Sequence, residues 1–331
     1  FGIQVVRQTA DLMNDPERGC GDDCKLGDAE YWNTRHNFVV ELVIEGDWKI
    51  LTTQVYAGVV LPELKKDKPV PGKFPCKRDF APDRNSTMVQ CSLKDELGHS
   101  WGGDQTRYIA IHADLVKLDA AGVVVEEADV WAIPTTEEGL AEAYTPWPLN
   151  VYGGYFNTVF VHPKRGQFID SPVHGITYET PTNWGTTQQG DDEGSGGFDF
   201  FPGEEIEFSV GSVSLGSALA SKKVSPLDIV MADANDPRVI NMARLLQSLD
   251  DDHGDGKINI RPIVVGCLDM AMENLGLLEA GIDWTSDSQV EAVINETIAR
   301  CAGNPEGIIL EAVSAEEAAD IKRAAERLPF L

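Results

Sequence analysis

The sequence predicts a mainly β protein with some α structure: an antiparallel β-sandwich domain, a small second β module and a C-terminal helical segment. Three observations predict this fold class. Between residues 36 and 224, short runs of β-branched and aromatic residues alternate with Gly, Asp and Pro turns, as in antiparallel hairpins. No helical pattern separates these runs, although a parallel sheet would need one. After residue 225, apolar residues recur at helical spacing instead.

The first half of the chain is predicted to hold an arm and a sandwich. Residues 1–35 are polar and predict an irregular N-terminal arm. Residues 36–162 predict the β-sandwich-like domain. Its first strand is the β-branched run 38–45, and the alternating run 108–116 forms a hairpin with the returning run 123–131. With 331 residues, the chain is long enough for more than one core.

Residues 163–224 predict a small second β module with a distinct motif. Asp170-Ser-Pro-Val-His-Gly-Ile-Thr-Tyr178 is followed by Phe198-Asp-Phe-Phe201, by the turn Pro202-Gly-Glu-Glu205 and by the closing run 206–216. This pattern resembles modules of bacterial secreted and outer-surface lipoproteins, which look like transthyretin-type or carboxypeptidase-regulatory-type β-sandwiches. The resemblance covers about residues 165–262. It implies a cell-surface β-sandwich followed by helices, and it implies no single activity.

Residues 225–331 predict the helical segment. Asp236 can cap a helix that has Pro237 at its first position. Ser286 and Ser314 each begin a capping-box pattern, which ends at Gln289 and Glu317 respectively and precedes apolar residues at helical spacing.

Charge restricts the possible partners. The chain has 54 Asp and Glu against 27 Lys and Arg, so its formal net charge is -27. This field repels phosphate backbones and anionic lipids, so nucleic acid is not an expected partner. No apolar run is long enough for a transmembrane segment. The sequence contains no signal peptide, and its start at Phe1 is what we expect of a processed, mature form.

The six cysteines form three pairs that are close in sequence, namely Cys20 with Cys24, Cys76 with Cys91, and Cys267 with Cys301. An even number of cysteines favours disulfides, although six cysteines allow fifteen connectivities. Zinc is the alternative, but its usual knuckle has two intervening residues rather than three, and no second knuckle is present. Disulfides imply an oxidising compartment, so we expect a secreted, cell-surface or periplasmic protein.

An acidic loop at residues 250–259 is the candidate metal site. Calcium prefers several carboxylate or amide oxygens at alternating positions and a Gly at the sharp turn of the loop. The candidate ligands are Asp250, Asp251, Asp252, Asp255 and Asn259. His253 replaces one oxygen ligand of the EF-hand pattern, and Pro262 stands where its bidentate carboxylate belongs. An acidic turn that follows a helix is the alternative interpretation.

Catalytic patterns do not fit their surroundings. Gly98-His-Ser-Trp-Gly102 matches the nucleophile elbow of serine hydrolases, which would make Ser100 the nucleophile and His162 or His174 the base. However, Lys94-Asp-Glu96 precedes it where an apolar strand should end, and a strand rather than a helix follows. His112 and Asp114 share a strand face, which we interpret as solvated.

The tryptophans are a second candidate surface. A sugar-binding face would stack on exposed indole rings, whereas burial in the sandwich is the competing interpretation. The tryptophans in question are Trp32, Trp48, Trp101, Trp131, Trp147 and Trp184.

These observations predict a non-catalytic extracellular or cell-surface bacterial protein that acts by binding or by self-assembly, in a structural or adhesive role. Calcium is the candidate cofactor, and the expected partners are a second copy, another cell-surface protein or a carbohydrate. The alternatives are a carbohydrate-binding module and a secreted serine hydrolase that uses Ser100.

Overall fold

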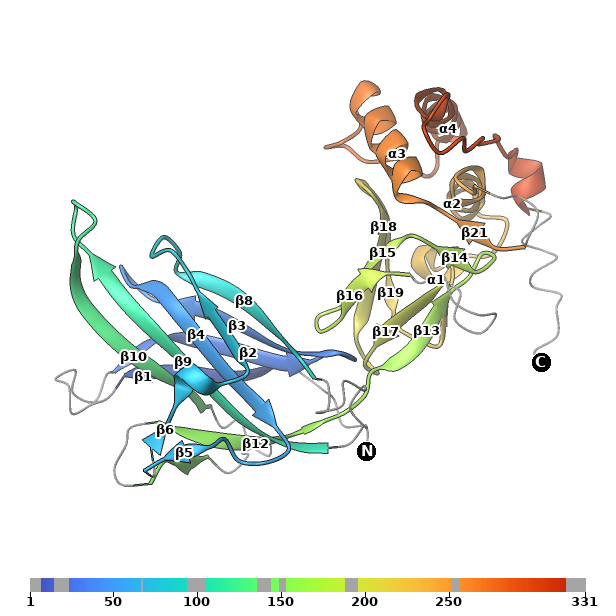
Figure 1. Ribbon diagram of the computed structural model, residues 1–331. Coiled ribbons are helices and arrows are strands. Elements are labelled where there is room, and N and C mark those ends of the chain that lie inside the picture. The colour runs from blue at the N-terminus through green and yellow to red at the C-terminus, as the bar shows by residue number, and fades with distance from the viewer. Residues whose placement is uncertain are drawn as a thin grey trace. The chain divides into compact units, whose positions relative to one another are not determined.

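The computed structural model describes residues 7–14, 24–66, 68–93, 105–135, 144–148, 153–187, 196–251 and 256–319 (Figure 1). With 44% strand and 20% helix, it confirms the mainly β fold class and its antiparallel sheets. The chain divides into an N-terminal unit that ends at His162 and a C-terminal unit that begins at Pro163. Each unit is described by itself below.

The described elements of the N-terminal unit are strands and one short 3₁₀ turn. They are β1 (Gln8–Asn14), β2 (Lys25–Asn33), β3 (Asn37–Ile44), β4 (Lys49–Gly58), β5 (Leu64–Lys65), β6 (Lys68–Pro69), η2 (Pro71–Lys73), β7 (Cys76–Asp79), β8 (Ser86–Ser92), β9 (Gln105–Leu118), β10 (Val124–Pro134), β11 (Thr145–Pro146) and β12 (Gly154–Phe160).

Long antiparallel pairings organise this unit. Strands β9, β10, β1, β2, β3 and β8 are neighbours in that order, while β9 also pairs with β4 and β12, and β4 pairs with β7. Two of the end strands, β7 and β8, are joined by the Cys76–Cys91 disulfide, whose Cα atoms are 5.6 Å apart. Strand β9 is therefore the central element, because three strands are hydrogen-bonded to it.

The sheet of the N-terminal unit buries hydrophobic side chains on two faces. Ile109 and Ile111 of β9 belong to the main core, which also contains Leu12 and Phe38. Ala110, between the two isoleucines, belongs to a second, smaller hydrophobic cluster. Because successive side chains of a strand point to opposite faces, the smaller cluster lies on the reverse face of the sheet.

The expected irregular arm at residues 1–35 is wrong for the described part, which forms strands β1 and β2. Ala10 and Leu12 of β1, and Ala29 and Tyr31 of β2, are buried. The apolar alternation is thus present, but two of its members are small alanines among charged residues. Burial in this case depends on pairing with β10 and β3, which a local pattern does not reveal.

In the C-terminal unit, residues 315–319 after Ser314 are helical, and the labelled elements are short strands and helices. They are β13 (Lys164–Phe168), β14 (Val173–His174), β15 (Thr177–Glu179), β16 (Trp184–Thr186), β17 (Gly197–Phe200), β18 (Glu205–Val210), β19 (Val213–Leu219), β20 (Lys223–Val224), α1 (Pro226–Val230), α2 (Pro237–Ser248), β21 (Ile258–Asn259), α3 (Pro262–Asn274) and α4 (Asp287–Cys301).

Strands and helices of the C-terminal unit share one core. Phe168 and Phe208 from the strands lie in the same hydrophobic cluster as Leu246 of α2, Leu268 of α3 and Val293 of α4. The predicted division at residue 224 into a β module (163–224) and a helical segment (225–331) is therefore not a boundary between two cores. The apolar faces of the helices need the strands to cover them.

None of the helices in the part of the chain that the structure describes combines the length and the apolar character needed to cross a membrane.

Candidate functional site

Two of the three expected disulfides are confirmed. Cys76 is bonded to Cys91 in the N-terminal unit, and Cys267 is bonded to Cys301 in the C-terminal unit. The expected bond between Cys20 and Cys24 falls outside the described residues, because Cys20 is not among them.

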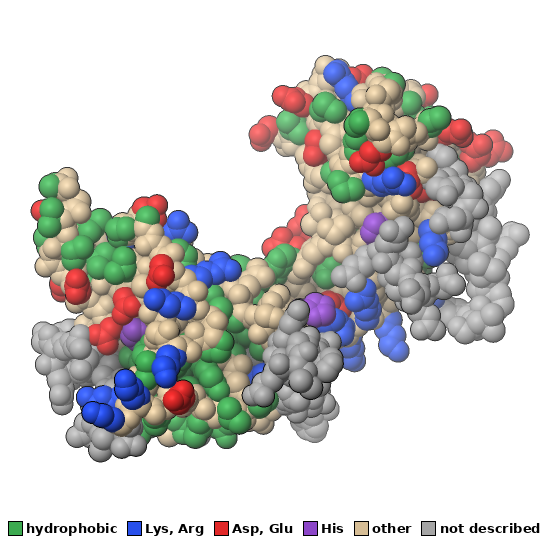
Figure 2. Space-filling model, viewed as in Figure 1, with side chains coloured by type: hydrophobic (Ala, Val, Ile, Leu, Met, Phe, Trp, Pro, Cys, Tyr) green, Lys and Arg blue, Asp and Glu red, His purple; other side chains and the backbone are tan. Residues whose placement is uncertain are grey.

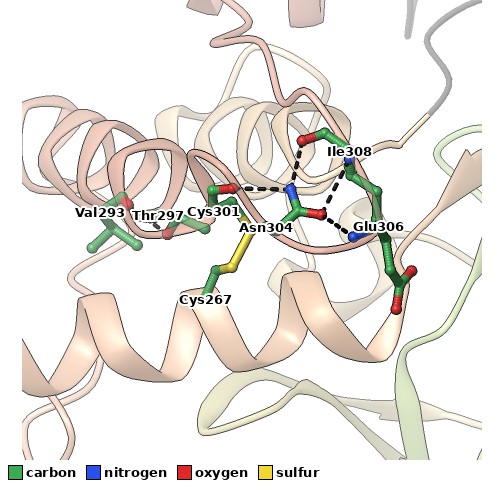
Figure 3. Close-up of a disulfide and its surroundings, with 7 residues drawn as sticks. All are labelled: Cys267, Val293, Thr297, Cys301, Asn304, Glu306 and Ile308. Atoms are coloured by element: carbon green, nitrogen blue, oxygen red, sulfur yellow. Dashed lines mark hydrogen bonds between the residues drawn. A yellow bond between two sulfur atoms is a disulfide. The ribbon is translucent and has the colours of Figure 1, made fainter.

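The C-terminal disulfide joins α3 to the end of α4 (Figure 3). Just beyond it, the Asn304 side chain closes the turn that follows α4. Its Nδ2 donates to the carbonyls of Cys301 and Ile308 at 2.9 and 2.7 Å. Its Oδ1 accepts from the backbone N–H of Glu306 at 3.0 Å. These bonds fix the backbone around the disulfide, so this part of the unit has a structural role.

The acidic loop is only partly described, because Asp252 and Asp255 lie outside the described residues. The Asp250 carboxylate accepts from the backbone N–H of Asn259, and the Asp251 carboxylate accepts from the Asn259 side-chain amide, each at 2.8 Å. These carboxylates thus hold β21 in place.

Arg261 contacts the Asp251 carboxylate, and His174 contacts the side-chain amide of Asn259. The Arg261 guanidinium forms an ion pair with the Asp251 carboxylate, and His174 Nδ1 lies 2.6 Å from Asn259 Oδ1. Within the described residues, no group of three or more His, Cys, Asp or Glu side chains is arranged to hold a metal ion. Calcium binding by this loop therefore stays a prediction, and a calcium ion on Asp251 would have to displace Arg261.

Within the described residues, the structure does not bring together the nucleophile and base of the serine hydrolase alternative. Ser100 lies outside the described residues. His162 and His174 belong to different units, and His174 is engaged with Asn259.

The interpretation of His112 and Asp114 as a solvated pair is wrong for His112, which is only 6% exposed. Its Nδ1 lies 2.7 Å from Gln54 Oε1, and the Gln54 amide donates to Asp114 Oδ2 at 2.9 Å. Its ring also packs against Trp131, with the ring centroids 4.6 Å apart. Burial lowers the pKa of His112, while the negative charges of Asp114 and Asp129 oppose that shift. Cross-strand packing of β4, β9 and β10 buries this face.

Most of the described tryptophans are buried, which excludes them as an open sugar-stacking face. Trp101 is outside the described residues. Trp184 is 38% exposed and Trp284 is half-buried, whereas four are at most 6% exposed, namely Trp32, Trp48, Trp131 and Trp147.

Trp131 and Trp147 form the centre of the smaller hydrophobic cluster on the reverse face of the sheet. Their ring centroids are 5.6 Å apart in an edge-to-face arrangement, and the Tyr155 ring lies 5.3 Å from that of Trp147. Aromatic pairs at such distances stabilise one another beyond their buried area. This aromatic cluster comes from β10, from the segment after β11, and from β12.

Two glycines allow the rings to approach the backbone. A Cβ on Gly153 would lie 2.4 Å from the Trp131 ring, and one on Gly154 would lie 2.4 Å from the Thr145 carbonyl oxygen. Gly153 also has φ +94°, a conformation that other residues rarely adopt. The Gly153-Gly154 pair therefore lets the Trp131 ring and the backbone of Thr145 lie directly against the chain that precedes Tyr155.

The aromatic cluster opens to the surface in a groove of about 290 Å³. The lining is mostly aliphatic and aromatic: Leu61, Pro62, Leu64, Thr145, Pro146, Trp147, Pro148 and Tyr155. Trp147 is 4% exposed, and its indole Nε1–H is a buried donor with no hydrogen-bond partner in the described part of the chain. An apolar groove that offers a spare donor suits a ligand with apolar side chains and a carbonyl oxygen.

Tyr56 helps to position the segment that forms one wall of the groove. Its hydroxyl donates to the carbonyl of Val60 at 2.6 Å, which holds the loop that continues into Leu61. Burial raises the pKa of Tyr56, and the neighbouring positive charge of Arg107 opposes that shift. A neutral phenol that donates to a carbonyl is consistent with this environment.

Basic residues gather beside the groove, although the chain as a whole is strongly acidic. Residues 61–80 carry six Lys and Arg against three Asp and Glu, whereas the whole chain carries 27 against 54. Lys65 and Lys68 lie directly opposite each other across the β5–β6 pair, and like charges in that position repel. All six Lys and Arg side chains are exposed. Lys73 and Lys77 are paired with Glu63 and Asp79, so the basic rim of the groove is Lys65, Lys66 and Lys68, which follow Leu64 of the lining.

Comparison with known proteins finds no matching family model, no similar curated protein and no similar solved structure. The resemblance to lipoprotein modules is therefore still a prediction. Sequence reasoning missed the groove, although two signals of it are present: the Thr145-Pro-Trp-Pro148 segment and the Lys-rich stretch 61–80.

Proposed function

We propose that the protein is a non-catalytic binding protein of an extracellular or cell-surface setting, and that its N-terminal unit binds a protein segment in the aromatic groove. The segment would be aliphatic and flanked by acidic residues. The observation that carries the proposal is the apolar groove beside an exposed basic rim on an otherwise acidic chain. The two disulfides support an oxidising compartment.

The lining of the groove favours a peptide over a sugar. Sugars need several polar partners as well as an open ring to stack on, whereas this lining has five aliphatic or proline residues, and Trp147 is buried. Aromatic-lined grooves suit protein segments whose conformation is already ordered before binding. The spare indole donor of Trp147 would pair with a peptide carbonyl.

The basic rim supports an acidic ligand. Within the described residues, no ion pair involves Lys65, Lys66 or Lys68. A carboxylate placed between Lys65 and Lys68 would relieve their mutual repulsion. Complementary charges at the edge of a binding site mainly select the partner and speed its association.

The test is a fluorescence-anisotropy titration of the full chain with the labelled hexapeptide Glu-Leu-Pro-Leu-Glu-Glu, which we call the glutamate-flanked peptide. We expect saturable binding, about tenfold weaker for the double variant Lys65→Glu, Lys68→Glu, because two attractions become repulsions. The matched control is Lys164→Glu, Lys222→Glu, which makes the same charge change at exposed positions of the C-terminal unit and should bind like the wild type.

Two comparison peptides sharpen the result. The peptide Glu-Ser-Gly-Ser-Glu-Glu keeps the charge but loses the apolar side chains, and Lys-Leu-Pro-Leu-Lys-Lys reverses the charge. Neither should bind measurably. Equal binding of all three peptides, or loss of binding in the control variant as well, would contradict the proposal.

Calcium at the acidic loop is a separate part of the proposal, supported by the sequence pattern of residues 250–259. We expect millimolar calcium to raise the melting temperature and a chelator to reverse the rise. Because Arg261 occupies the Asp251 carboxylate, Arg261→Ala should increase calcium affinity. A melting temperature that calcium leaves unchanged in both proteins would show that the loop is only an acidic turn.

A further inference from the structure

The tip of the β9–β10 hairpin is an exposed apolar surface. Val123, Val124 and Val125 are 59%, 45% and 62% exposed, and Ala120 and Ala121 beside them are exposed as well. Figure 1 shows this hairpin projecting from the rest of the N-terminal unit. Single exposed apolar residues are ordinary, but a contiguous run at a projecting tip is typical of an interaction surface.

The surroundings of this hairpin tip are acidic. Residues 119–127 contain three Asp and Glu and no Lys or Arg. Glu126 is partly neutralised by Lys117 at 2.9 Å. Glu127 lines a neighbouring cavity of about 220 Å³ together with Asp114 and Asp129. The tip thus has the two properties for which the groove is suited, namely aliphatic side chains and a negative flank.

The hairpin tip and the groove lie at opposite ends of strand β9. Tyr108 pairs with Gly58 close to the groove, and Leu118 pairs with Val124 at the tip. At about 3.3 Å per residue, the ten steps between Tyr108 and Leu118 span roughly 33 Å. The tip therefore cannot reach the groove of its own chain, but it can reach that of another copy.

We propose that the groove binds the hairpin tip 119–125 of a second copy of this chain. This inference rests on the proposed function and identifies the protein segment that the groove takes. The contact joins two different surfaces, so it is heterologous, and it continues head to tail into an open assembly or closes into a ring.

Charge also sets how this contact responds to salt. Two copies with a net charge of -27 each repel one another at long range. At physiological ionic strength the Debye length is about 8 Å, so long-range repulsion is screened, whereas the close contact between the basic rim and Glu127 is less affected. Self-association should therefore be weak at very low salt, strongest near physiological salt and weak again in molar salt.

The size of the groove limits the affinity of this contact. Its volume of about 290 Å³ is just below the roughly 300–1,000 Å³ typical of binding pockets, so it takes a few side chains rather than a domain face. The contact should be weak and concentration-dependent, as transient interfaces are.

The test is sedimentation velocity of the full chain from micromolar to millimolar concentration. We expect the average mass of the wild type to rise with concentration. Val124→Ser, Val125→Ser removes the apolar tip, and Lys65→Glu, Lys68→Glu removes the basic rim. Each variant should stay monomeric. All four positions are exposed, so these changes should leave the fold intact, which circular dichroism checks.

Mixing the two variants is the decisive step. The rim variant keeps an intact tip and the tip variant keeps an intact groove, so an equimolar mixture should form dimers and nothing larger. A mixture that stays monomeric, or a tip variant that still assembles, overturns the inference. If the wild type stays monomeric but binds the glutamate-flanked peptide, the inference of self-association is wrong and the proposed function stands. If the wild type stays monomeric and does not bind the peptide, both are wrong.

Discussion

The two units of this protein place their aromatic and polar side chains differently. In the C-terminal unit, the phenylalanines of the strands and the apolar faces of the helices meet in one hydrophobic cluster. In the N-terminal unit, the sheet carries a core on one face and a second, aromatic cluster on the other. In the N-terminal unit, aromatic side chains of the second cluster therefore lie next to a surface groove.

Buried polar side chains have identifiable contacts in both units. In the C-terminal unit, Glu204 accepts from the Thr182 hydroxyl and from the backbone N–H of Phe201, and Asp170 accepts from Gln247 at 3.0 Å. Both acidic residues belong to the motif of residues 165–262, and they hold loops in place. In the N-terminal unit, the Trp147 indole donor is unpartnered within the described residues. These contacts give the two acidic residues of the motif a structural role, and the proposed binding groove lies in the other unit.

The largest expected effect is the loss of stability when a disulfide is removed, and this loss should differ between the two units. The Cys267–Cys301 bond spans 34 residues and the Cys76–Cys91 bond spans 15. Replacing each pair by serine should lower the free energy of unfolding of its unit by about 4 and about 3 kcal/mol respectively, because a longer closed loop restricts the unfolded chain more. Urea unfolding followed by circular dichroism measures both effects. A larger loss from the N-terminal pair would contradict this order.

The next effect concerns the glycine beneath the aromatic cluster. Gly153→Ala should destabilise the N-terminal unit by about 1–3 kcal/mol, because the added methyl overlaps the Trp131 ring, and it should abolish binding of the glutamate-flanked peptide. Gly203→Ala is the matched control, since its φ of +96° is nearly the same as the +94° of Gly153 but nothing lies near the added Cβ. Equal effects of the two variants on peptide binding would argue against the steric explanation.

A third change tests the structural role of the C-terminal motif. Glu204→Ala leaves the buried N–H of Phe201 and the Thr182 hydroxyl without their acceptor. It should destabilise the C-terminal unit by about 1–3 kcal/mol. Peptide affinity should not change, because the groove lies in the other unit. Unfolding curves measure the stability of this variant, and the anisotropy titration measures its peptide affinity. A weaker peptide affinity would contradict a purely structural role for Glu204.

The smallest effect depends on pH. Burial holds the pKa of His112 below its ordinary value of 6.5 in the folded state, against the opposing influence of Asp114 and Asp129. The unfolded chain therefore binds the proton more readily, and the free energy of unfolding falls as the pH drops below about 6.5, by at most about 1.4 kcal/mol per pH unit. His112→Gln should remove this component from unfolding measurements between pH 7.5 and 5.5. An unchanged pH slope would contradict a buried, neutral imidazole.

The sequence predicts local structure well where the signal is local. The caps at Asp236, Ser286 and Ser314 are confirmed, because each side chain accepts a backbone N–H of the first helical turn. The strand runs 38–45 and 108–116, and the two described disulfides, are also present. Each of these features depends on neighbouring residues or on a simple alternation.

The groove could not be predicted in this way, because it depends on pairings between distant segments. Leu61 follows β4, Trp147 follows β11 and Tyr155 lies in β12, and they meet only because β4 and β12 both pair with β9. The alternation in β9 indicates that one face is buried. It does not indicate that the other face is covered too, so His112 was expected to be solvated.

The central claim is that binding belongs to the N-terminal unit, and hydrogen–deuterium exchange with the glutamate-flanked peptide tests it most directly. The account predicts slower exchange in the segments that form the groove, namely 61–66, 145–148 and 153–156, and unchanged exchange throughout the described part of the C-terminal unit. Protection centred on the motif residues 170–178 or 201–206, with the groove segments unchanged, would contradict it.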